Sequence, residues 1–255
     1  MIVTVIGAGR IGGALTECAR AVGREVRLVD RERGWEALDA PAGAPIVVAV
    51  RNDDLDDVVE RVPASRRADL VFVQNGMIRE RLAERGLADA TRGLLFFAVA
   101  RRGDPPVPGG PSPFHGRHAA AMVDFFVDLR LPATEVDAPT FAAIELEKLI
   151  WNSAFGVLCQ AHEATVGEVV ERHADELRAL AGELSTIGRI ALDVDLELEP
   201  LCERLQAYSR SIADYRGAVR EWRWRNGWFV AQSTALGVPT PTHERLLDRA
   251  RAWPQ

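Results

Sequence analysis

The chain has 255 residues, 47% of them hydrophobic, and can therefore bury a sizeable core, which excludes a disordered protein. Its formal net charge of −6 argues against nucleic acids and membranes as partners, because both attract an excess of cationic side chains. No apolar run reaches the roughly 20 residues of a membrane-spanning helix.

The first half of the chain alternates short apolar runs with helical patterns, which is typical of a parallel sheet with crossover helices. Strands are predicted at Val3–Ile6, Glu25–Val29, Pro45–Val50 and Leu70–Val73, and helices at Gly12–Val22, Asp54–Val62 and Ile78–Arg85. A further apolar run follows at Leu94–Ala100. The Gly/Pro-rich stretch Arg102–Gly116 predicts a loop or an irregular hairpin that could act as a lid.

From Asp137 onward the strand patterns nearly vanish and long helical patterns replace them. Helices are predicted at roughly Thr140–Ala161, Thr165–Leu192, Leu198–Val219 and Glu221–Leu236, the last closed by Gly237. The sequence thus predicts an α/β fold, with an N-terminal Rossmann-type parallel-sheet domain over residues 1–136 and an all-α C-terminal domain over residues 137–255.

A glycine motif follows the first predicted strand, and it matches the pattern G-x-G-x-x-G between a strand and a helix. The first glycine permits a tight turn, the second lets the backbone approach a pyrophosphate, and the third lets helix and strand pack closely. The helix start then turns free N–H groups toward the phosphates. A glycine-rich turn without a ligand is the less favoured interpretation. The cofactor-binding residues predicted here are Gly7, Gly9, Arg10, Ile11 and Gly12.

The second predicted strand leads to Asp30, 18 residues after Gly12. A carboxylate at this place accepts hydrogen bonds from the adenosine ribose and repels a 2′-phosphate, which favours NAD(H). Arg31 and Arg33 follow directly and could bind that phosphate instead, which favours NADP(H). The residues leave the choice between the two cofactors open.

Lys148 is the one lysine among 31 basic residues. It lies four residues before Asn152, so both share one face of a predicted helix that is otherwise largely apolar. Burial can lower the pKa of a lysine, whereas arginine stays charged. Lys148 is therefore a candidate for a role that arginine cannot fill, and chance retention on a surface beside Glu145 is the alternative.

The segment of residues 221–228 reads Glu-Trp-Arg-Trp-Arg-Asn-Gly-Trp. A tryptophan-rich face more often packs in a core or between domains than it binds a substrate. The five histidines have no clustered partners along the sequence, so no metal site is predicted. The three cysteines are far apart and suit neither a metal nor a disulfide pattern, and the chain starts without a signal-peptide pattern. We expect a cytoplasmic protein.

Four segments together resemble the ketopantoate reductase (2-dehydropantoate 2-reductase) family. They are the glycine motif of residues 5–12, the Val-Gln-Asn-Gly-Met of residues 73–77, the Glu-Lys-Leu-Ile-Trp-Asn of residues 147–152, and parts of residues 225–241, which are similar to the family's closing helix and turn. The resemblance covers most of the chain. It implies an NADP(H)-dependent enzyme that reduces 2-oxo acids.

The resemblance also implies catalytic roles for three residues. Lys148 would hydrogen-bond the substrate carbonyl and supply its proton. Asn152 would help to orient the substrate, and Glu221, which by itself is an ordinary solvated helix residue, would be the family's active-site glutamate.

Further roles concern the cofactor and the substrate carboxylate. The resemblance implies that Asn75 lies near the nicotinamide end of the cofactor and that Arg31 binds the 2′-phosphate of NADP(H). A serine that binds the substrate carboxylate would be Ser209 or Ser211, depending on where a one-residue gap is placed.

The chain departs from the family pattern in three respects. Gly156 stands where the family commonly has a second substrate-binding asparagine, and Arg51 replaces a lysine that usually follows the third strand. The chain is also shorter than a typical member. These departures leave cofactor binding and a lysine-assisted reaction intact but put ketopantoate itself in question as the substrate.

We therefore predict an NAD(P)H-dependent oxidoreductase that reduces a 2-oxo acid with Lys148 as the acid, acting on a small-molecule substrate. The alternative, which Gly156 and Arg51 favour, is a protein that binds NAD(P) without catalysis and works through a partner. The sequence leaves the oligomeric state open, with a homodimer through helical surfaces as a common arrangement.

Overall fold

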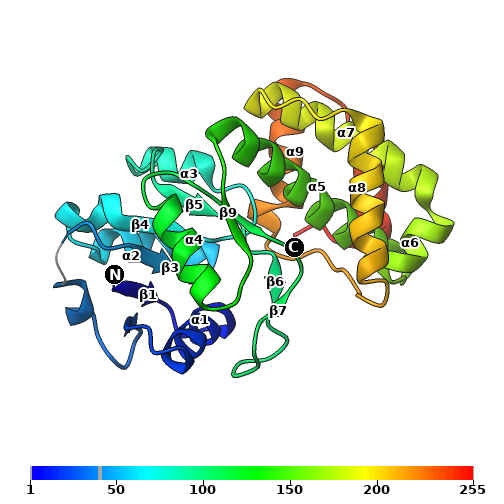
Figure 1. The fold of residues 1–255 in the computed structure, drawn as a ribbon. Coiled ribbons are helices and arrows are strands. Elements are labelled where there is room, and N and C mark those ends of the chain that lie inside the picture. Colours follow the sequence, from blue (N-terminus) through cyan, green and yellow to red (C-terminus); the bar gives the residue numbers. More distant parts are fainter. Residues whose placement is uncertain (1, 40–41, 255) are drawn as a thin grey trace. The chain divides into compact units, whose positions relative to one another are not determined.

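The structure is a computed structural model that describes residues 2–39 and 42–254. The chain divides into two compact units, Met1–Phe141 and Ala142–Gln255. The first unit contains all the strands of the described residues, and the second is helical (Figure 1). This confirms the predicted fold class. No helix among the described residues is long and apolar enough to cross a membrane.

The first unit is built on a seven-stranded sheet in the order β2-β1-β3-β4-β5-β8-β9. Neighbouring strands from β2 to β5 are parallel, β8 is antiparallel to β5, and β9 is parallel to β8. The strands are β1 (Val3–Ile6), β2 (Val26–Val29), β3 (Ile46–Val48), β4 (Leu70–Phe72), β5 (Thr91–Gly93), β8 (Ser112–His115) and β9 (Ala133–Glu135), with β6 (Phe97–Ala98) and β7 (Val107–Pro108) forming a separate antiparallel pair.

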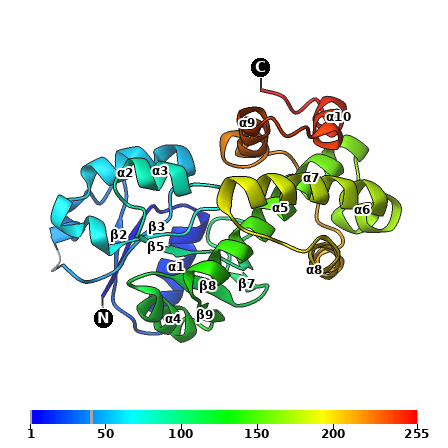
Figure 2. The same cartoon turned by 90° about the horizontal axis from the view of Figure 1, so that it is seen from above.

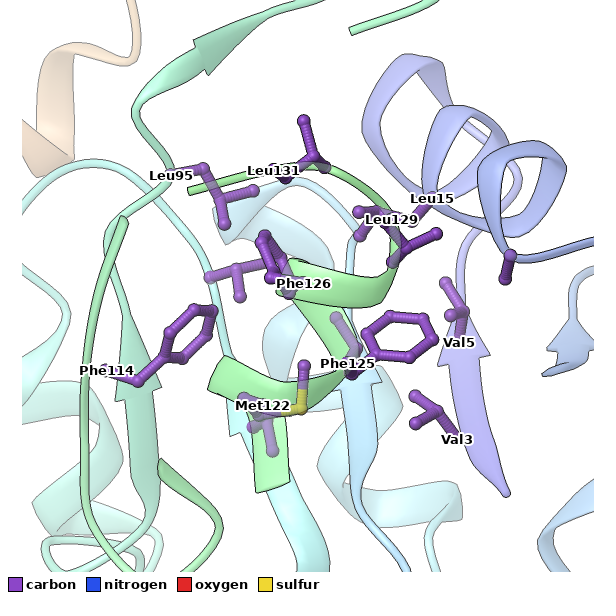
Figure 3. Packing of buried hydrophobic residues seen from close by; sticks show 14 of the residues in the cluster. Val3, Val5, Leu15, Leu95, Phe114, Met122, Phe125, Phe126, Leu129 and Leu131 are labelled. Atoms are coloured by element: carbon purple, nitrogen blue, oxygen red, sulfur yellow. The ribbon is translucent and has the colours of Figure 1, made fainter. Parts of the chain in front are cut away.

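Helices cover both faces of this sheet. Figure 2 shows α1 and α4 on one face and α2 and α3 on the other. The core below α1 and α4 joins Val3 and Val5 of β1 to Leu15 of α1 and to Phe125 and Phe126 of α4 (Figure 3). The helices are α1 (Arg10–Ala21), α2 (Leu55–Arg61), α3 (Arg79–Glu84) and α4 (Ala119–Asp128), with 3-10 turns η1 (Glu36–Asp39), η2 (Asn52–Asp54) and η3 (Ala64–Asp69).

The ladder brings the carboxyl ends of three strands to one edge. Ile6 of β1 pairs with Val48 of β3, which in turn pairs with Phe72 of β4. Residues that follow these strands therefore meet at the same edge, beside β1, where the chain switches from β2 on one side to β3 on the other. In open parallel sheets this is where ligands bind.

The apolar run Leu94–Ala100 contains β6, and the sheet strand β5 lies just before it. One expectation for the first unit needs correction. The stretch Arg102–Gly116 is partly a hairpin, since β7 pairs with β6, but its end forms the buried sheet strand β8. Proline and glycine around Ser112 and Phe114 hid this strand, because such residues usually mark loops. A lid role for the stretch stays a prediction.

The second unit consists of helices packed around α5 and α7. Most of α5 is apolar, and its Leu146, Ile150 and Phe155 are fully buried. The helix α7 contacts α6, α8, α9 and α10. The bounds are α5 (Ala138–His162), α6 (Val166–Arg172), α7 (Ala174–Leu192), α8 (Leu198–Ser211), η4 (Trp222–Trp224), α9 (Asn226–Leu236) and α10 (Pro241–Arg249). Four residues of α5 precede the division between the units.

Three predicted helices of this unit are shorter than the sequence pattern indicates. The helix expected over Thr165–Leu192 is broken at His173, and the one expected over Leu198–Val219 ends at Ser211. The chain then crosses α5, and a Cβ on Gly217 would lie 2.7 Å from the Phe155 carbonyl oxygen. The helix expected from Glu221 begins only at Asn226.

Candidate active site

The glycine loop lies at the carboxyl edge of the sheet, between β1 and α1. Gly7 has φ of +106°, and a Cβ there would lie 2.7 Å from the Ala49 carbonyl oxygen. A Cβ on Gly12 would lie 1.9 Å from the Gly7 carbonyl oxygen. Both distances are shorter than any real contact of a Cβ, so the turn and the packing of α1 require glycine at both positions.

Gly9 differs from these two glycines, because a Cβ there would meet no heavy atom of the described residues within 4 Å. The fold itself therefore leaves space above Gly9, which precedes the first turn of α1. Arg10 is exposed at the start of the helix, and Ile11 packs against the hydrophobic core. Open space in front of a helix N-terminus fits a pyrophosphate, because the first backbone N–H groups have no partner within the helix.

Asp30 follows β2, but its carboxylate closes its own turn. Oδ1 accepts hydrogen bonds from the backbone N–H groups of Glu32 and Arg33, at 3.0 and 2.8 Å, and Oδ2 pairs with the Arg33 guanidinium. These backbone bonds, with the arginine charge, lower the pKa of Asp30. Arg31 is exposed. Asp30 is thus engaged within the protein, whereas Arg31 remains open to solvent.

Two amides at the same edge hold the ends of β3 and β4 together. The side chain of Asn52, which is buried after β3, donates to the Asn75 carbonyl oxygen at 2.7 Å. Gln74 donates to the Val48 and Val50 carbonyl oxygens at 2.8 and 3.2 Å. Asn75 itself is half-buried. Asn52 is not among the predicted site residues, and its place directly after a central strand is the sequence signal that it belongs to this edge.

The second unit places Lys148 and Asn152 on one face of α5, as the spacing predicts. Lys148 is half-buried, and the Asn152 side chain donates to the Lys148 carbonyl oxygen at 2.8 Å. Burial, together with the nearby charge of Arg225, lowers the pKa of Lys148 to about 7. A lysine in this state can change its protonation at neutral pH, which an exposed lysine cannot do.

Arg225 links Lys148 to Glu221. Its guanidinium is largely buried and forms an ion pair of 2.5 Å with Glu221. Burial lowers the pKa of Arg225, while the Glu221 carboxylate opposes this shift. Glu221 lies outside the helix, with φ of +48°. The structure thus adds Arg225 to the predicted residues, and the i, i+4 spacing from Glu221 was the signal for it.

The two candidate serines have different surroundings. Ser209 is fully buried, and its hydroxyl donates to the Leu205 carbonyl oxygen and accepts a bond of 2.9 Å from the Trp151 indole. Ser211 is exposed at the end of α8, where its hydroxyl donates to the Tyr208 carbonyl oxygen. Of the two, only Ser211 is open to a ligand from solvent.

Trp151 also organises aromatic side chains beside the lysine. Its ring stacks on Phe155 and lies edge-on to Tyr208, with ring centroids 5.4 and 5.0 Å apart. Tyr215, which is close enough to affect the pKa of Arg225, lies 6.3 Å from Trp151 by the same measure. Both tyrosines are partly exposed. The lysine face of α5 is therefore bordered by aromatic surface.

The departure at Gly156 has a packing reason. A Cβ there would lie 3.0 Å from the Ala218 carbonyl oxygen, because the segment after α8 crosses α5 at this point. Val219 donates its backbone N–H to the Gln160 side chain in the same crossing. An asparagine at position 156 would have to displace this segment. Arg51, the second departure, is exposed at the carboxyl edge of the sheet, after β3.

A glycine loop between a strand and a helix, at the carboxyl edge of a parallel sheet, defines the first unit as a Rossmann-type fold. Over residues 140–253 the chain matches the family described as "Ketopantoate reductase PanE/ApbA C terminal". The helical region thus matches the C-terminal domain of ketopantoate reductases, and the resemblance found in the sequence is confirmed. No curated protein matches the chain in sequence.

Solved structures are similar over nearly the whole chain. A PanE/ApbA family ketopantoate reductase from Ralstonia eutropha JMP134 has 18% identity and a TM-score of 0.76, covering 98% of this chain and 97% of that chain. A dimeric ketopantoate reductase from Staphylococcus aureus has 13% identity and a TM-score of 0.74, with 99% and 98% covered. A complex of D-mandelate dehydrogenase with NADH has 16% identity and a TM-score of 0.75, with 99% and 98% covered. At these identities the likeness establishes the fold.

Proposed function

We propose that this chain is an NAD(P)H-dependent oxidoreductase that reduces the carbonyl group of a 2-oxo acid, with Lys148 as the proton donor. The observation that carries the proposal is the lowered pKa of Lys148, about 7, on a helix of the ketopantoate reductase C-terminal domain. Efficient general acids have pKa values near the working pH. Two similar structures, a ketopantoate reductase and a D-mandelate dehydrogenase, are enzymes whose names point to this reaction class.

The first unit would hold the cofactor. The space over Gly9 and the N-terminus of α1 fit the pyrophosphate, and Asn75, fixed through its carbonyl oxygen by Asn52, would border the nicotinamide end. When bound, the cofactor supplies the hydride for the carbonyl carbon. The protein's part is to position the reactants and to provide the proton.

The cofactor preference follows from the turn after β2. The Asp30 carboxylate accepts hydrogen bonds within its own turn and is paired with the Arg33 guanidinium, whose positive charge offsets its repulsion of a 2′-phosphate. Arg31 is exposed beside it. We therefore propose NADP(H) as the preferred cofactor, and expect Arg31→Ala to weaken NADPH binding while leaving NADH binding nearly unchanged.

The second unit would provide the acid. Lys148 holds a proton at Nζ and donates it to the carbonyl oxygen, where negative charge develops during reduction. Asn152 donates a hydrogen bond to the Lys148 backbone carbonyl and so holds that turn of α5. The positive charge of Arg225 lowers the pKa of Lys148, and the ion pair with Glu221 offsets part of that charge. Ser211 is the serine left open for a substrate carboxylate.

The departures at Gly156 and Arg51 support a second candidate, a protein that binds NAD(P) without turnover. The two candidates are separated by titrating the purified protein with NADPH and with NADH, following tryptophan fluorescence, and then adding branched, straight-chain and aryl 2-oxo acids. Binding followed by oxidation of the cofactor supports the reductase. Tight binding with no oxidation by any 2-oxo acid supports the second candidate.

The remaining expectations concern assembly and location. A homodimer, a cytoplasmic location and the absence of nucleic-acid partners remain part of the proposal, with the dimeric enzyme from Staphylococcus aureus as support for the first. Sedimentation of the purified protein at several concentrations tests the homodimer.

A further inference from the structure

The second unit contains a cluster of potential metal ligands that the reductase mechanism does not use. His162 ends α5, His173 lies at the break between α6 and α7, and Glu176 lies in the first turn of α7. Each residue offers one potential ligand atom, a ring nitrogen or a carboxylate oxygen, and these three atoms lie within 4.8 Å of one another. The histidines are eleven residues apart, and the helix break at His173 brings them together. No spacing along the sequence indicates this cluster, because the fold brings the three side chains together.

The geometry of the cluster leaves donor atoms unused. His162 Nε2 lies 2.6 Å from Glu176 Oε2, and the two imidazole rings stack with centroids 3.6 Å apart. The His173 ring does not cap α7 and makes no hydrogen bond to the other described residues. Stacking alone uses neither of its nitrogens, so at least one nitrogen of His173 can serve as a ligand.

We propose that His162, His173 and Glu176 form a binding site for a divalent transition metal ion, with Zn²⁺ as the expected occupant. Two imidazoles and one carboxylate are a donor set that Zn²⁺ accepts, and such three-residue sites keep a fourth position for water. Two ligand atoms on one Zn²⁺ ion are roughly 3.3 Å apart, given bonds of about 2.0–2.1 Å. The donors already lie within 4.8 Å of one another, and binding requires the two stacked imidazole rings to turn until their nitrogens converge on the ion.

The surroundings set the expected strength of the site. Arg245 holds the second Glu176 oxygen at 2.5 Å, which orients the carboxylate as an outer partner of a metal ligand commonly does. The charges of Arg245, Arg172 and Arg249 lie close to the cluster and oppose a dication. We therefore expect weaker binding than at a structural zinc site with thiolate ligands, and selection against Ca²⁺ and Mg²⁺, which prefer oxygen ligands.

A metal ion in this position would join the last turn of α5 to the first turn of α7. Since α5 also carries Lys148 and Asn152, the ion would stabilise the helix on which the proposed acid lies, without touching that acid. Binding to the folded chain raises its melting temperature by mass action. The metal site and the reductase can thus be tested separately.

The experiment uses the full chain after treatment with a chelator. Co²⁺ is titrated while its d–d absorption is recorded, Zn²⁺ is then added to displace it, and bound metal is counted after dialysis. We expect one Zn²⁺ per chain, displacement of Co²⁺ by Zn²⁺ but not by Mg²⁺, and an increase in melting temperature with Zn²⁺. His173→Ala and Glu176→Gln should each weaken binding by roughly tenfold or more, whereas His115→Ala, a histidine outside the cluster, should bind as the unchanged chain does.

The proposal is overturned if the unchanged chain retains no metal, or if His173→Ala and His115→Ala bind Zn²⁺ equally. His173 is half-buried, so its alanine variant should fold. A loss of melting temperature in Glu176→Gln that is the same with and without Zn²⁺ would identify the cluster as a helix contact only, and would also overturn the proposal.

Discussion

The glycine loop and the surroundings of Lys148, here called the lysine cluster (Lys148, Asn152, Glu221 and Arg225), are built by opposite means. In the loop, backbone conformation and missing side chains create the site: Gly7 and Gly12 leave no room for a Cβ, while Gly9 leaves empty space. In the cluster, a charged side chain is taken out of water and placed near a second cation, Arg225. The first site depends on space and the second on electrostatics, so different substitutions should damage them.

The largest effect is expected at the lysine. Lys148→Met keeps a side chain of similar length but removes the proton donor, so kcat for reduction should fall by about 10²–10⁴-fold. Lys148→Arg keeps the charge, but a guanidinium does not release its proton at working pH, and it should not restore activity. Both variants should bind NADPH as the unchanged chain does. Turnover by Lys148→Met within a few-fold of the unchanged chain would exclude Lys148 as the acid.

The second largest effect is expected on NADPH affinity, from a substitution in the glycine loop. Gly9→Ala places a methyl group in open space, so the fold should keep its stability while NADPH affinity drops by roughly tenfold or more, which is about 1.4 kcal/mol or more. Gly13→Ala, in the first turn of α1 with its nearest contact at 3.8 Å, is the matched control and should leave affinity unchanged. Fluorescence titration measures both. Equal affinities for the two variants would argue against a cofactor over Gly9.

Introducing at position 156 the asparagine that the family commonly has there should not restore the substrate contact that this asparagine makes. Gly156→Asn forces a Cβ against the Ala218 carbonyl oxygen and should destabilise the chain by about 1–3 kcal/mol, as overpacking does. The same change at Gly182 in α7 meets only ordinary contacts, at 3.6 Å, and should cost much less. Urea unfolding followed by circular dichroism compares them. A Gly156→Asn chain as stable as the unchanged one would show that the crossing segment can move aside.

The smallest expected effect is a shift in the pH dependence of reduction, which tests how the charges of Arg225 and Glu221 act on the pKa of Lys148. Reduction requires protonated Lys148, so kcat/KM should fall as the pH rises through about 7. Arg225→Gln removes a like charge and should move this midpoint to higher pH, whereas Glu221→Gln removes the partner of Arg225 and should move it to lower pH. Shifts of less than one pH unit are expected. Two shifts of the same sign would contradict the assigned roles of these residues.

The sequence could predict the features that depend on residues a few positions apart, and not the contacts between residues distant along the chain. The glycine loop and the shared face of Lys148 and Asn152 follow from spacings of a few residues, which secondary structure alone converts into geometry. The bond between Asn52 and Asn75 and the approach of Arg225 to Lys148 join residues 23 and 77 positions apart. No local pattern contains them, so they became visible only in the structure.

The errors of the sequence analysis have the same origin. Strand β8 was missed because Pro113 and the prolines and glycines before it are typical of a loop, although pairing with β5 and β9 stabilises the strand. The break at His173 falls within a continuous helical pattern, and it is tertiary packing that turns the chain there. The role of Asp30 toward a ribose stays a prediction, and the structure adds that its carboxylate also closes the turn that follows it, which position along the sequence could not show.

The central claim is that Lys148 is an acid whose pKa lies near neutrality, and the chain allows a direct test because it contains no other lysine. Protein labelled with ¹³C or ¹⁵N in lysine side chains should give a single lysine signal, whose chemical shift can be followed by NMR from acid to alkaline pH without substrate. We predict a midpoint at about pH 7. A midpoint near 10.4, the value of an ordinary exposed lysine, would contradict the proposed mechanism.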